Sequence, residues 1–309
     1  MSAATRALVT GGAGFIGSHL AERLVADGHS VCVVDDLSTG LASNVPSETR
    51  LHRVDICDWD SLRGVIAAFR PEVVFHAAAQ TDVRRSVREP DFDARVNVLG
   101  GLNVLRAAVG AGTRRIVYAS SAAVYGTPEQ LPVSEAHPTR PISEYGASKL
   151  ALEHYLHAYQ ARGLIEFAAL RFANVYGVRQ RADGEAGVVA IFTRQMLAGE
   201  PATIFGDGTK TRDYVYVGDV VEATVRAAWG GPAGVVANLG WGREVSDLEL
   251  FREVAAATRY AAGPTHAADR PGDIGRMCLD PALAQRTWDW KATVTLRDGI
   301  RRVVEWSAC

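Results

Sequence analysis

The chain has 309 residues, enough for about two domains. Its 48% hydrophobic and 22% charged residues and its mean hydropathy of 0.00 are typical of a globular protein and exclude a disordered chain. With 33 basic and 35 acidic residues, the net charge is −2. The chain therefore lacks the overall positive field of a nucleic-acid binder, and any bound anion must be held by a few placed groups.

The cysteines and the start of the chain bear on the compartment. Cys32, Cys57, Cys278 and Cys309 form neither a CxxC pair nor a metal-ligand spacing, so we expect reduced thiols and no metal site. No apolar run approaches the roughly 18 residues of a membrane span. The first residues show no apolar segment typical of a signal peptide, and we expect a cytoplasmic protein.

Strand-like runs alternate with amphipathic stretches through the first half of the chain. The runs are nearly all apolar, which is typical of strands buried on both faces of a parallel sheet. We expect strands at 7–10, 31–34, 51–54, 73–76, 116–119 and 165–170, and helices at 15–26, 60–69, 97–109 and 144–162. This order predicts a doubly wound parallel α/β (Rossmann) sheet, with the loops after the strands along one edge.

The second half has a different texture. Four prolines predict an extended loop over 125–143. After Asn174, we expect a helix at 188–197 and short strands at 203–205 and 214–217. We therefore divide the chain into a first domain, residues 1–173, and a smaller α/β domain, residues 174–309, with some segments returning to the first.

The segment between the first strand and the first helix carries glycines at 11, 14 and 17. Without Cβ atoms, they allow a tight turn and close approach of a pyrophosphate to the helix N-terminus. Asp35 ends the second strand about 20 residues later, where a carboxylate accepts from ribose hydroxyls and repels a 2′-phosphate. NAD is therefore favoured over NADP, the alternative for Asp35 being a simple turn residue. Asp55 lies either near the adenine or in a turn.

A second constellation opens the helix expected at 144–162. Tyr145 and Lys149 are four residues apart and share a helix face. A nearby ammonium favours the phenolate, so Tyr145 could exchange a proton with a sugar hydroxyl. Ser120 and Ser121 end the fifth strand and would face the same crevice. The alternatives are an exposed Tyr and Lys at a helix start and a serine turn.

Together these motifs resemble the extended short-chain dehydrogenase/reductase family, and the resemblance runs across almost the whole chain. Further matching segments are 121–126, 171–177, 211–217 and 270–273. Within the family, the chain is most similar to bacterial UDP-glucose 4-epimerases of the shorter type. The resemblance implies that residues 1–173 bind NAD and residues 174–309 mainly bind a nucleotide sugar. It also implies a homodimer built on the helices at 97–109 and 147–160.

The resemblance assigns roles residue by residue. Ser121 would bond the sugar 4-hydroxyl, Tyr145 would take its proton and Lys149 would tune Tyr145 and hold the nicotinamide ribose, so these three are the catalytic candidates. The positions that match the NAD groove are Gly11, Gly14, Phe15, Ile16, Asp35, Asp55, Ile56, Ala77, Ala78, Ala79, Asn97, Ser120, Tyr145 and Lys149. The positions that match the substrate site are Ser121, Tyr145, Asn174, Gly187, Val188, Arg212, Arg270, Asp273 and Met277.

Some of these roles have structural alternatives. Arg212 and Arg270 match arginines that clamp the diphosphate, but each could instead form a salt bridge, for example Arg212 with Asp213. His76 matches a family histidine, and we expect it to be buried with a backbone partner. Met277 stands where the family sets the size of the sugar pocket, and it is neither a large aromatic nor a very small residue.

The residues after Ser121 select among the reactions of the family. Relatives that dehydrate or decarboxylate nucleotide sugars carry acidic residues there, whereas this chain has Ala122 and Ala123. The expected activity is therefore epimerisation at C4 of a UDP-hexose, UDP-glucose or UDP-galactose, through a 4-keto intermediate with tightly bound, recycled NAD. The alternatives are 4-epimerisation of UDP-glucuronate or UDP-N-acetylglucosamine, a net NAD-dependent sugar dehydrogenase, and a non-enzymatic nucleotide sensor.

Overall fold

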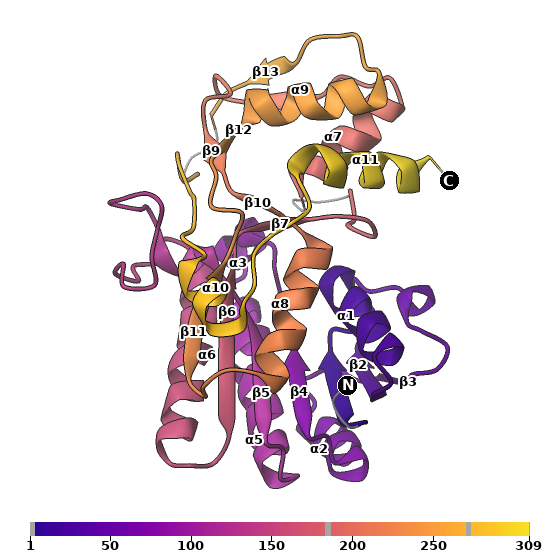
Figure 1. Ribbon diagram of the computed structural model, residues 1–309, viewed down its shortest axis with the longest axis vertical. Helices are drawn as coiled ribbons and strands as arrows, with labels where there is room; N and C mark the ends of the chain where they lie inside the picture. Colours follow the sequence, from indigo (N-terminus) through magenta and orange to yellow (C-terminus); the bar gives the residue numbers. More distant parts are fainter. Residues whose placement is uncertain (1–3, 183–186, 270–272, 309) are drawn as a thin grey trace.

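The computed structural model describes residues 4–182, 187–269 and 273–308, and a parallel seven-stranded sheet forms its centre (Figure 1). The strand order is β11-β6-β5-β4-β1-β2-β3. The strands are β1 (Arg6–Thr10), β2 (Ser30–Asp35), β3 (Arg50–Arg53), β4 (Val73–His76), β5 (Arg115–Ser121), β6 (Glu166–Phe172) and β11 (Val235–Leu239). The predicted doubly wound α/β fold is confirmed, and the order reverses between β1 and β4.

Helices cover both faces of this sheet. Their bounds are α1 (Phe15–Ala26), α2 (Trp59–Phe69), α5 (Gly101–Gly110), α6 (Glu144–Ala161) and α8 (Val217–Trp229). One buried cluster joins α2, α5 and α6 to the sheet through side chains such as Leu62, Leu105 and Leu152. On the other face, Leu20 of α1 and Val220 of α8 belong to a second cluster. Fully burying one such side chain stabilises the fold by about 1.5–3 kcal/mol.

Residues 97–109 are helical as expected, but the helical region begins earlier than predicted. The chain forms α3 (Val83–Arg88), α4 (Pro90–Ala94) and a π-helical turn, η2 (Arg95–Gly100), before α5 begins. The Asp82 side chain caps α3 by accepting from the Arg85 N–H at 2.9 Å. Pro90 separates α3 from α4, because it lacks the N–H that would continue a helix. The polar composition of 81–95 hid these short helices from the periodicity analysis.

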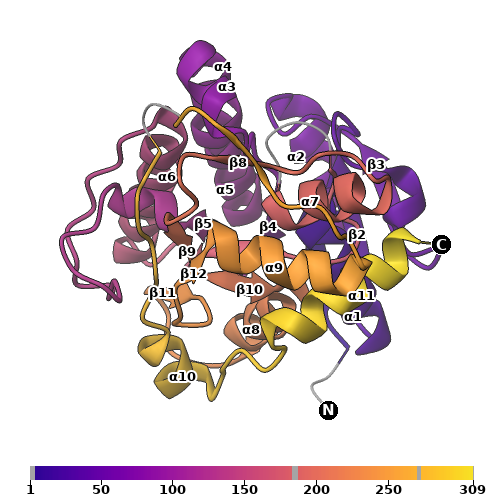
Figure 2. The ribbon, with the colours of Figure 1, turned by 90° about the horizontal axis from the view of Figure 1, so that it is seen from above.

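The second half of the chain forms a smaller lobe above the sheet, in which α7, α9 and α11 pack together (Figures 1 and 2). Three two-stranded sheets complete it. The remaining elements are β7 (Asn174–Tyr176), α7 (Val188–Leu197), β8 (Thr203–Phe205), β9 (Thr211–Arg212), β10 (Tyr214–Tyr216), β12 (Val245–Ser246), α9 (Asp247–Thr258), β13 (Thr265–Ala267), α10 (Ala282–Trp288) and α11 (Leu296–Ser307), with the 3-10 turns η1 (Ala42–Asn44) and η3 (Ala122–Tyr125). No helix of the described residues is long and apolar enough to cross a membrane.

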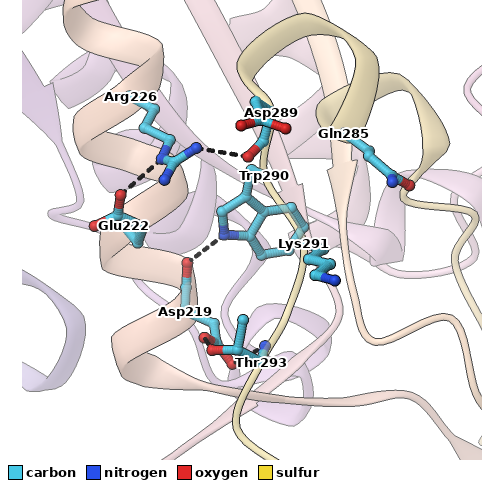
Figure 3. Close-up of a pocket in the computed structure, with 8 residues that line it drawn as sticks. All are labelled: Asp219, Glu222, Arg226, Gln285, Asp289, Trp290, Lys291 and Thr293. Carbon is cyan, nitrogen blue, oxygen red and sulfur yellow. Dashed lines mark hydrogen bonds and ion pairs between the residues drawn. The ribbon is translucent and has the colours of Figure 1, made fainter.

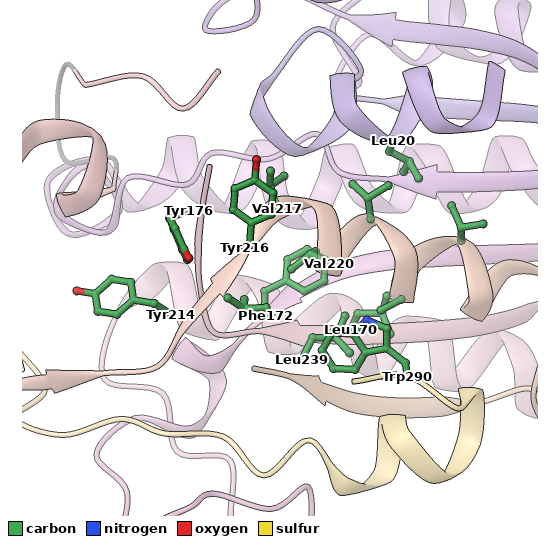
Figure 4. Close-up of a cluster of buried hydrophobic side chains, with 14 of the residues drawn as sticks. Leu20, Leu170, Phe172, Tyr176, Tyr214, Tyr216, Val217, Val220, Leu239 and Trp290 are labelled. Atoms are coloured by element: carbon green, nitrogen blue, oxygen red, sulfur yellow. The ribbon is translucent and has the colours of Figure 1, made fainter. Parts of the chain in front are cut away.

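Aromatic side chains join the lobe to the sheet, as Figure 4 shows. Tyr176 and Tyr216 meet edge-to-face with ring centroids 5.7 Å apart, and Tyr214 packs against Tyr176 in the same manner at 6.3 Å. Their cluster continues through Phe172 into the core of the sheet. Because each ring buries a large apolar area, the lobe and the sheet share one continuous core.

The segment after α10 returns to the sheet side of the molecule and is pinned to α8 (Figure 3). Arg226 donates to the Trp288 carbonyl at 3.0 Å and to the Asp289 carbonyl at 2.5 Å. The Trp290 indole N–H donates to the Asp219 carbonyl at 2.8 Å. The residues that line this hollow therefore make contacts that hold the chain in place. β11 adds residues of the second half to the sheet, and this segment packs on α8, which covers the sheet.

Candidate active site

The glycine turn lies at the reversal point of the sheet, where ligands bind in doubly wound folds. Gly11 has φ +71°, and a Cβ there would come within 2.6 Å of the Ala78 nitrogen. A Cβ on Gly17 would overlap the Gly11 carbonyl oxygen. Gly14 precedes the first turn of α1, and no side chain caps that helix. The free N–H groups and the absence of side chains form a cradle that fits the pyrophosphate of NAD.

Asp35 braces this cradle from the end of β2. Its carboxylate oxygens accept from the Ala13 N–H and the Leu37 N–H, each at 2.9 Å. Burial raises the pKa of Asp35, and the two backbone bonds oppose the rise. Asp55 is exposed and accepts from the Cys57 N–H at 2.8 Å, so it forms a local turn.

The remaining positions expected at the NAD groove follow the same edge of the sheet. Asn97 is buried, with its Oδ1 accepting from the Gln80 N–H at 2.9 Å and its Nδ2 donating to the Gln80 carbonyl at 3.0 Å. Its side chain therefore braces the segment after β4 against η2. The half-buried members of the set are Phe15 and Ile16 in the first turn of α1 and Ala77, Ala78 and Ala79 after β4, while Ile56 is buried.

The Tyr–Lys pair stands on the first two turns of α6. Ser143 caps this helix by accepting from the Gly146 N–H at 3.1 Å. The Lys149 Nζ donates to the Ala119 carbonyl at 2.8 Å and lies 5.9 Å from the centroid of the Tyr145 ring. The Ser121 side chain lies close enough to the Tyr145 hydroxyl to lower the pKa of Tyr145. The structure thus brings together all three residues expected to be catalytic.

Burial dominates the electrostatics of this pair. Burial raises the pKa of Tyr145 to about 12. The neighbouring Ser121 side chain opposes this rise, and the Asp93 charge adds to it. Burial also lowers the pKa of Lys149 to about 8, against the opposing charges of Asp93 and Glu153. The pKa of Tyr145 is therefore raised, whereas the sequence predicted that Lys149 would lower it, because burial dominates.

A buried polar network beneath the site was missed by the sequence analysis. The Ser120 hydroxyl donates to Glu153 at 2.5 Å, and Arg171 pairs with the other Glu153 oxygen at 2.7 Å. Arg171 also donates to the Tyr125 hydroxyl at 2.9 Å, which in turn donates to Asn238 at 2.7 Å. Two signals could have revealed it: Glu153 lies four residues after Lys149, and Arg171 is a cation inside an apolar strand.

His76 is buried as expected, but its partner is not the backbone. Its Nδ1 shares a hydrogen bond of 2.8 Å with the Thr10 hydroxyl. Burial, with help from the Lys149 charge, lowers the pKa of His76 to about 3. The imidazole therefore stays neutral and links the ends of β1 and β4.

Arg212 and Asp213 do not form the salt bridge that the sequence left open. Asp213 is fully buried, and its carboxylate accepts from the backbone N–H groups of Trp241, Gly242 and Leu279. Burial raises the pKa of Asp213 to about 6. Arg212 is half-buried, donates to the Thr211 carbonyl at 2.8 Å and has no ion pair with any described residue. Its guanidinium therefore keeps donors for an anion.

The other expected substrate residues have the following places. Asn174 is exposed on β7, Gly187 precedes α7 and Val188 opens it. Asp273 accepts from Lys210 at 3.1 Å. Met277 is buried in the same cluster as Ala122 and Tyr125, which follow Ser121. Arg270 lies outside the described residues.

The reversal of strand order at a glycine turn, beside a Ser–Tyr–Lys trio, defines a dinucleotide-binding enzyme of the short-chain dehydrogenase/reductase class. Comparison with known proteins narrows the class. Residues 7–240 match the NAD dependent epimerase/dehydratase family, and the chain belongs to that family.

Three relatives illustrate the similarity. The chain is 48% identical to a UDP-glucose 4-epimerase of Mycolicibacterium smegmatis over 308 residues, with 97% of each chain covered. It superposes on the Thermotoga maritima UDP-glucose 4-epimerase, solved with UDP-glucose, with a TM-score of 0.96, 40% identity and 98% of each chain covered. The Thermus thermophilus UDP-glucose 4-epimerase, solved with NAD, gives 0.92 and 43% identity, covering 97% of this chain and 98% of that one.

Proposed function

We propose that this protein is an NAD-dependent epimerase that inverts C4 of a UDP-hexose, interconverting UDP-glucose and UDP-galactose. The observation that carries the proposal is the Ser121–Tyr145–Lys149 trio beside the glycine cradle. The relatives named above, which are similar over nearly the whole chain, support the same activity.

The chain's own residues account for the proton chemistry. Ser121 orients the C4 hydroxyl, and Tyr145 accepts its proton and later returns it to the 4-keto intermediate. The Lys149 ammonium stabilises the negative charge that Tyr145 carries before it accepts this proton and again after it returns it. NAD, held at the glycine cradle of Gly11, Gly14 and Gly17, would supply the hydride acceptor and donor for C4. Ala122 and Ala123 offer no second acid or base, so no water is eliminated from the sugar.

We assign the cofactor to residues 1–173 and the UDP-sugar mainly to residues 174–309. Gly11, Gly14, Phe15, Ile16, Asp35, Asp55, Ile56, Ala77, Ala78, Ala79, Asn97 and Ser120 would line the NAD groove. Asn174, Gly187, Val188, Arg212, Arg270, Asp273 and Met277 would hold the nucleotide sugar. Arginines on the diphosphate fix the ligand at its charged end, which leaves the sugar free to turn between the two half-reactions.

The functional test is incubation of the pure protein with UDP-glucose and, separately, with UDP-glucuronate and UDP-N-acetylglucosamine. We expect the highest kcat/KM with UDP-glucose and no build-up of NADH. A preference for one of the other two sugars would select that epimerase instead, and Met277, buried beside Ala122, is the residue to vary. Formation of NADH in proportion to an oxidised product would identify a dehydrogenase.

We also propose that the protein is a homodimer. Val87 of α3, Leu99 of η2 and Tyr155 of α6 are 58%, 57% and 42% exposed, and both α3 and η2 pack against α6. Exposed apolar side chains on adjoining helices suit a symmetric contact between two copies.

Light scattering after size-exclusion chromatography tests the dimer. We expect twice the chain mass for the wild type and a monomer for Leu99→Glu. Leu41→Glu is the control, because Leu41 is 55% exposed but precedes η1 and donates its backbone N–H to the Ala13 carbonyl in the turn after β1. A monomeric wild type would refute the dimer.

A further inference from the structure

Two buried charged groups lie close to Tyr145 without a direct counter-ion. Lys149 is 3% exposed, and among the described residues its Nζ has one hydrogen-bond partner, the Ala119 carbonyl. Asp93, on α4, is 1% exposed and forms no ion pair with any described residue. Burying a charge is costly unless an opposite charge compensates it.

The hydrogen bonds of Asp93 fall on one oxygen. Gln80 Nε2 donates to Oδ1 at 2.8 Å and Asn97 Nδ2 donates to the same atom at 3.0 Å. The second oxygen, Oδ2, is buried and has no hydrogen-bond partner in the described part of the chain. Asn97 also donates to the Ser148 hydroxyl at 3.1 Å, and Ser148 lies between Tyr145 and Lys149 on α6. Asp93 is thereby tied to the helix that carries the Tyr–Lys pair.

We propose that Asp93 is the counter-charge of Lys149, a positioning residue that keeps the ammonium charged and seated beside Tyr145. The expected effect of Asp93 on turnover rests on the proposed function. Its effect on the charge of Lys149 does not, because it depends only on the folded protein.

The other groups that face Lys149 do not supply this charge. Glu153, one turn along α6, is neutralised by Arg171 at 2.7 Å. His76 on β4 is neutral at ordinary pH, because its pKa is lowered to about 3. The rings of Tyr118 and Tyr145 lie 4.9 and 5.9 Å from Nζ, and burial raises the pKa of both tyrosines. Among the described residues, Asp93 is thus the uncompensated negative charge near Lys149.

The sign of the effect is the same for both members of the pair. Asp93 favours the protonated ammonium of Lys149 and disfavours the phenolate of Tyr145, so its charge raises the pKa of each. Removing the charge therefore lowers both pKa values. Activity needs Tyr145 to lose its proton while Lys149 stays protonated. Because both pKa values fall, the whole pH range of activity moves to lower pH.

The sequence allows a direct measurement, because Lys149, Lys210 and Lys291 are the only three lysines. In the purified holoenzyme with isotope-labelled lysine, NMR resolves three side-chain signals, which Lys210→Arg and Lys291→Arg assign. Asp93→Asn is isosteric and keeps the Oδ1 acceptor for Gln80 and Asn97. We expect it to lower the midpoint of the Lys149 titration by about one pH unit and to move both limbs of the kcat–pH profile the same way.

Two variants control this test. Asp91→Asn removes an exposed charge from the same helix and should leave the Lys149 midpoint unchanged. Asp93→Glu keeps the charge and should restore the wild-type midpoint. An unchanged midpoint in folded Asp93→Asn, or a fall as large in Asp93→Glu, overturns the inference. Since the titration needs no reaction, failure of the proposed epimerase activity would leave this result readable.

Discussion

Replacing Tyr145 by Phe lowers kcat for C4 epimerisation by about 10³-fold and leaves bound NAD in place. The variant loses only the hydroxyl that accepts and returns the proton of the sugar. Its ring can keep its place beside Lys149, whose Nζ lies 5.9 Å from the ring centroid. Steady-state turnover of UDP-glucose, with the NAD content of the pure variant measured after denaturation, checks both parts.

Tyr155→Phe is the matched control for this variant. Tyr155 lies on the same helix, α6, at the proposed dimer contact; its side chain is 42% exposed, its hydroxyl has no catalytic role in the proposal, and phenylalanine keeps the ring that makes the contact. We expect unchanged turnover. Full activity in Tyr145→Phe, or an equal loss in both variants, would remove Tyr145 from the mechanism.

Replacing Gly11 by Ala destabilises the fold by about 3 kcal/mol and abolishes NAD binding. The backbone at Gly11 has φ +71°, which is unfavourable for a residue with a Cβ. The new methyl group would also press on the Ala78 backbone and push the turn after β1 away from the segment after β4. Chemical denaturation and the NAD content of the purified variant measure the two effects.

Gly64→Ala gives the comparison at a permissive position. Gly64 lies within α2, and a Cβ there meets no atom within 4 Å. We expect this variant to bind NAD normally and to be up to about 1 kcal/mol more stable, because alanine favours the helix. A Gly11→Ala protein that is as stable and as rich in NAD as Gly64→Ala would contradict the cradle.

The sequence predicts the fold well where the signal is local. Apolar runs flanked by turns place six strands of the sheet within a residue or two, although β11 was not predicted. The expected helices at 15–26 and 188–197 match α1 and α7. The region 83–100 is different, because its short helices are polar and are held by tertiary contacts. Two-residue strands such as β9 and β12 have no periodicity to detect, since their pairing partners lie far along the chain.

The site divides in the same way. The four-residue spacing of Tyr145 and Lys149, in a chain that also has the glycine turn, indicates this pair. The order of the motifs along the chain relates the pair to Ser121. By contrast, the Glu153–Arg171 pair and Asp93 depend on which elements pack together, and this is decided by the fold. Asp213 shows most clearly what the sequence does not predict. Its neighbour in sequence is Arg212, but its carboxylate accepts hydrogen bonds from backbone N–H groups 28 or more residues away.

The fate of the hydrogen at C4 tests the central claim most directly. UDP-glucose carrying deuterium at C4 is incubated with the purified protein without added NAD, and the products are analysed by NMR and mass spectrometry. The account predicts UDP-galactose with the deuterium retained at C4, because the same hydride leaves one face of the sugar and returns to the other. Absence of UDP-galactose, or its formation with the deuterium lost to solvent, would contradict it.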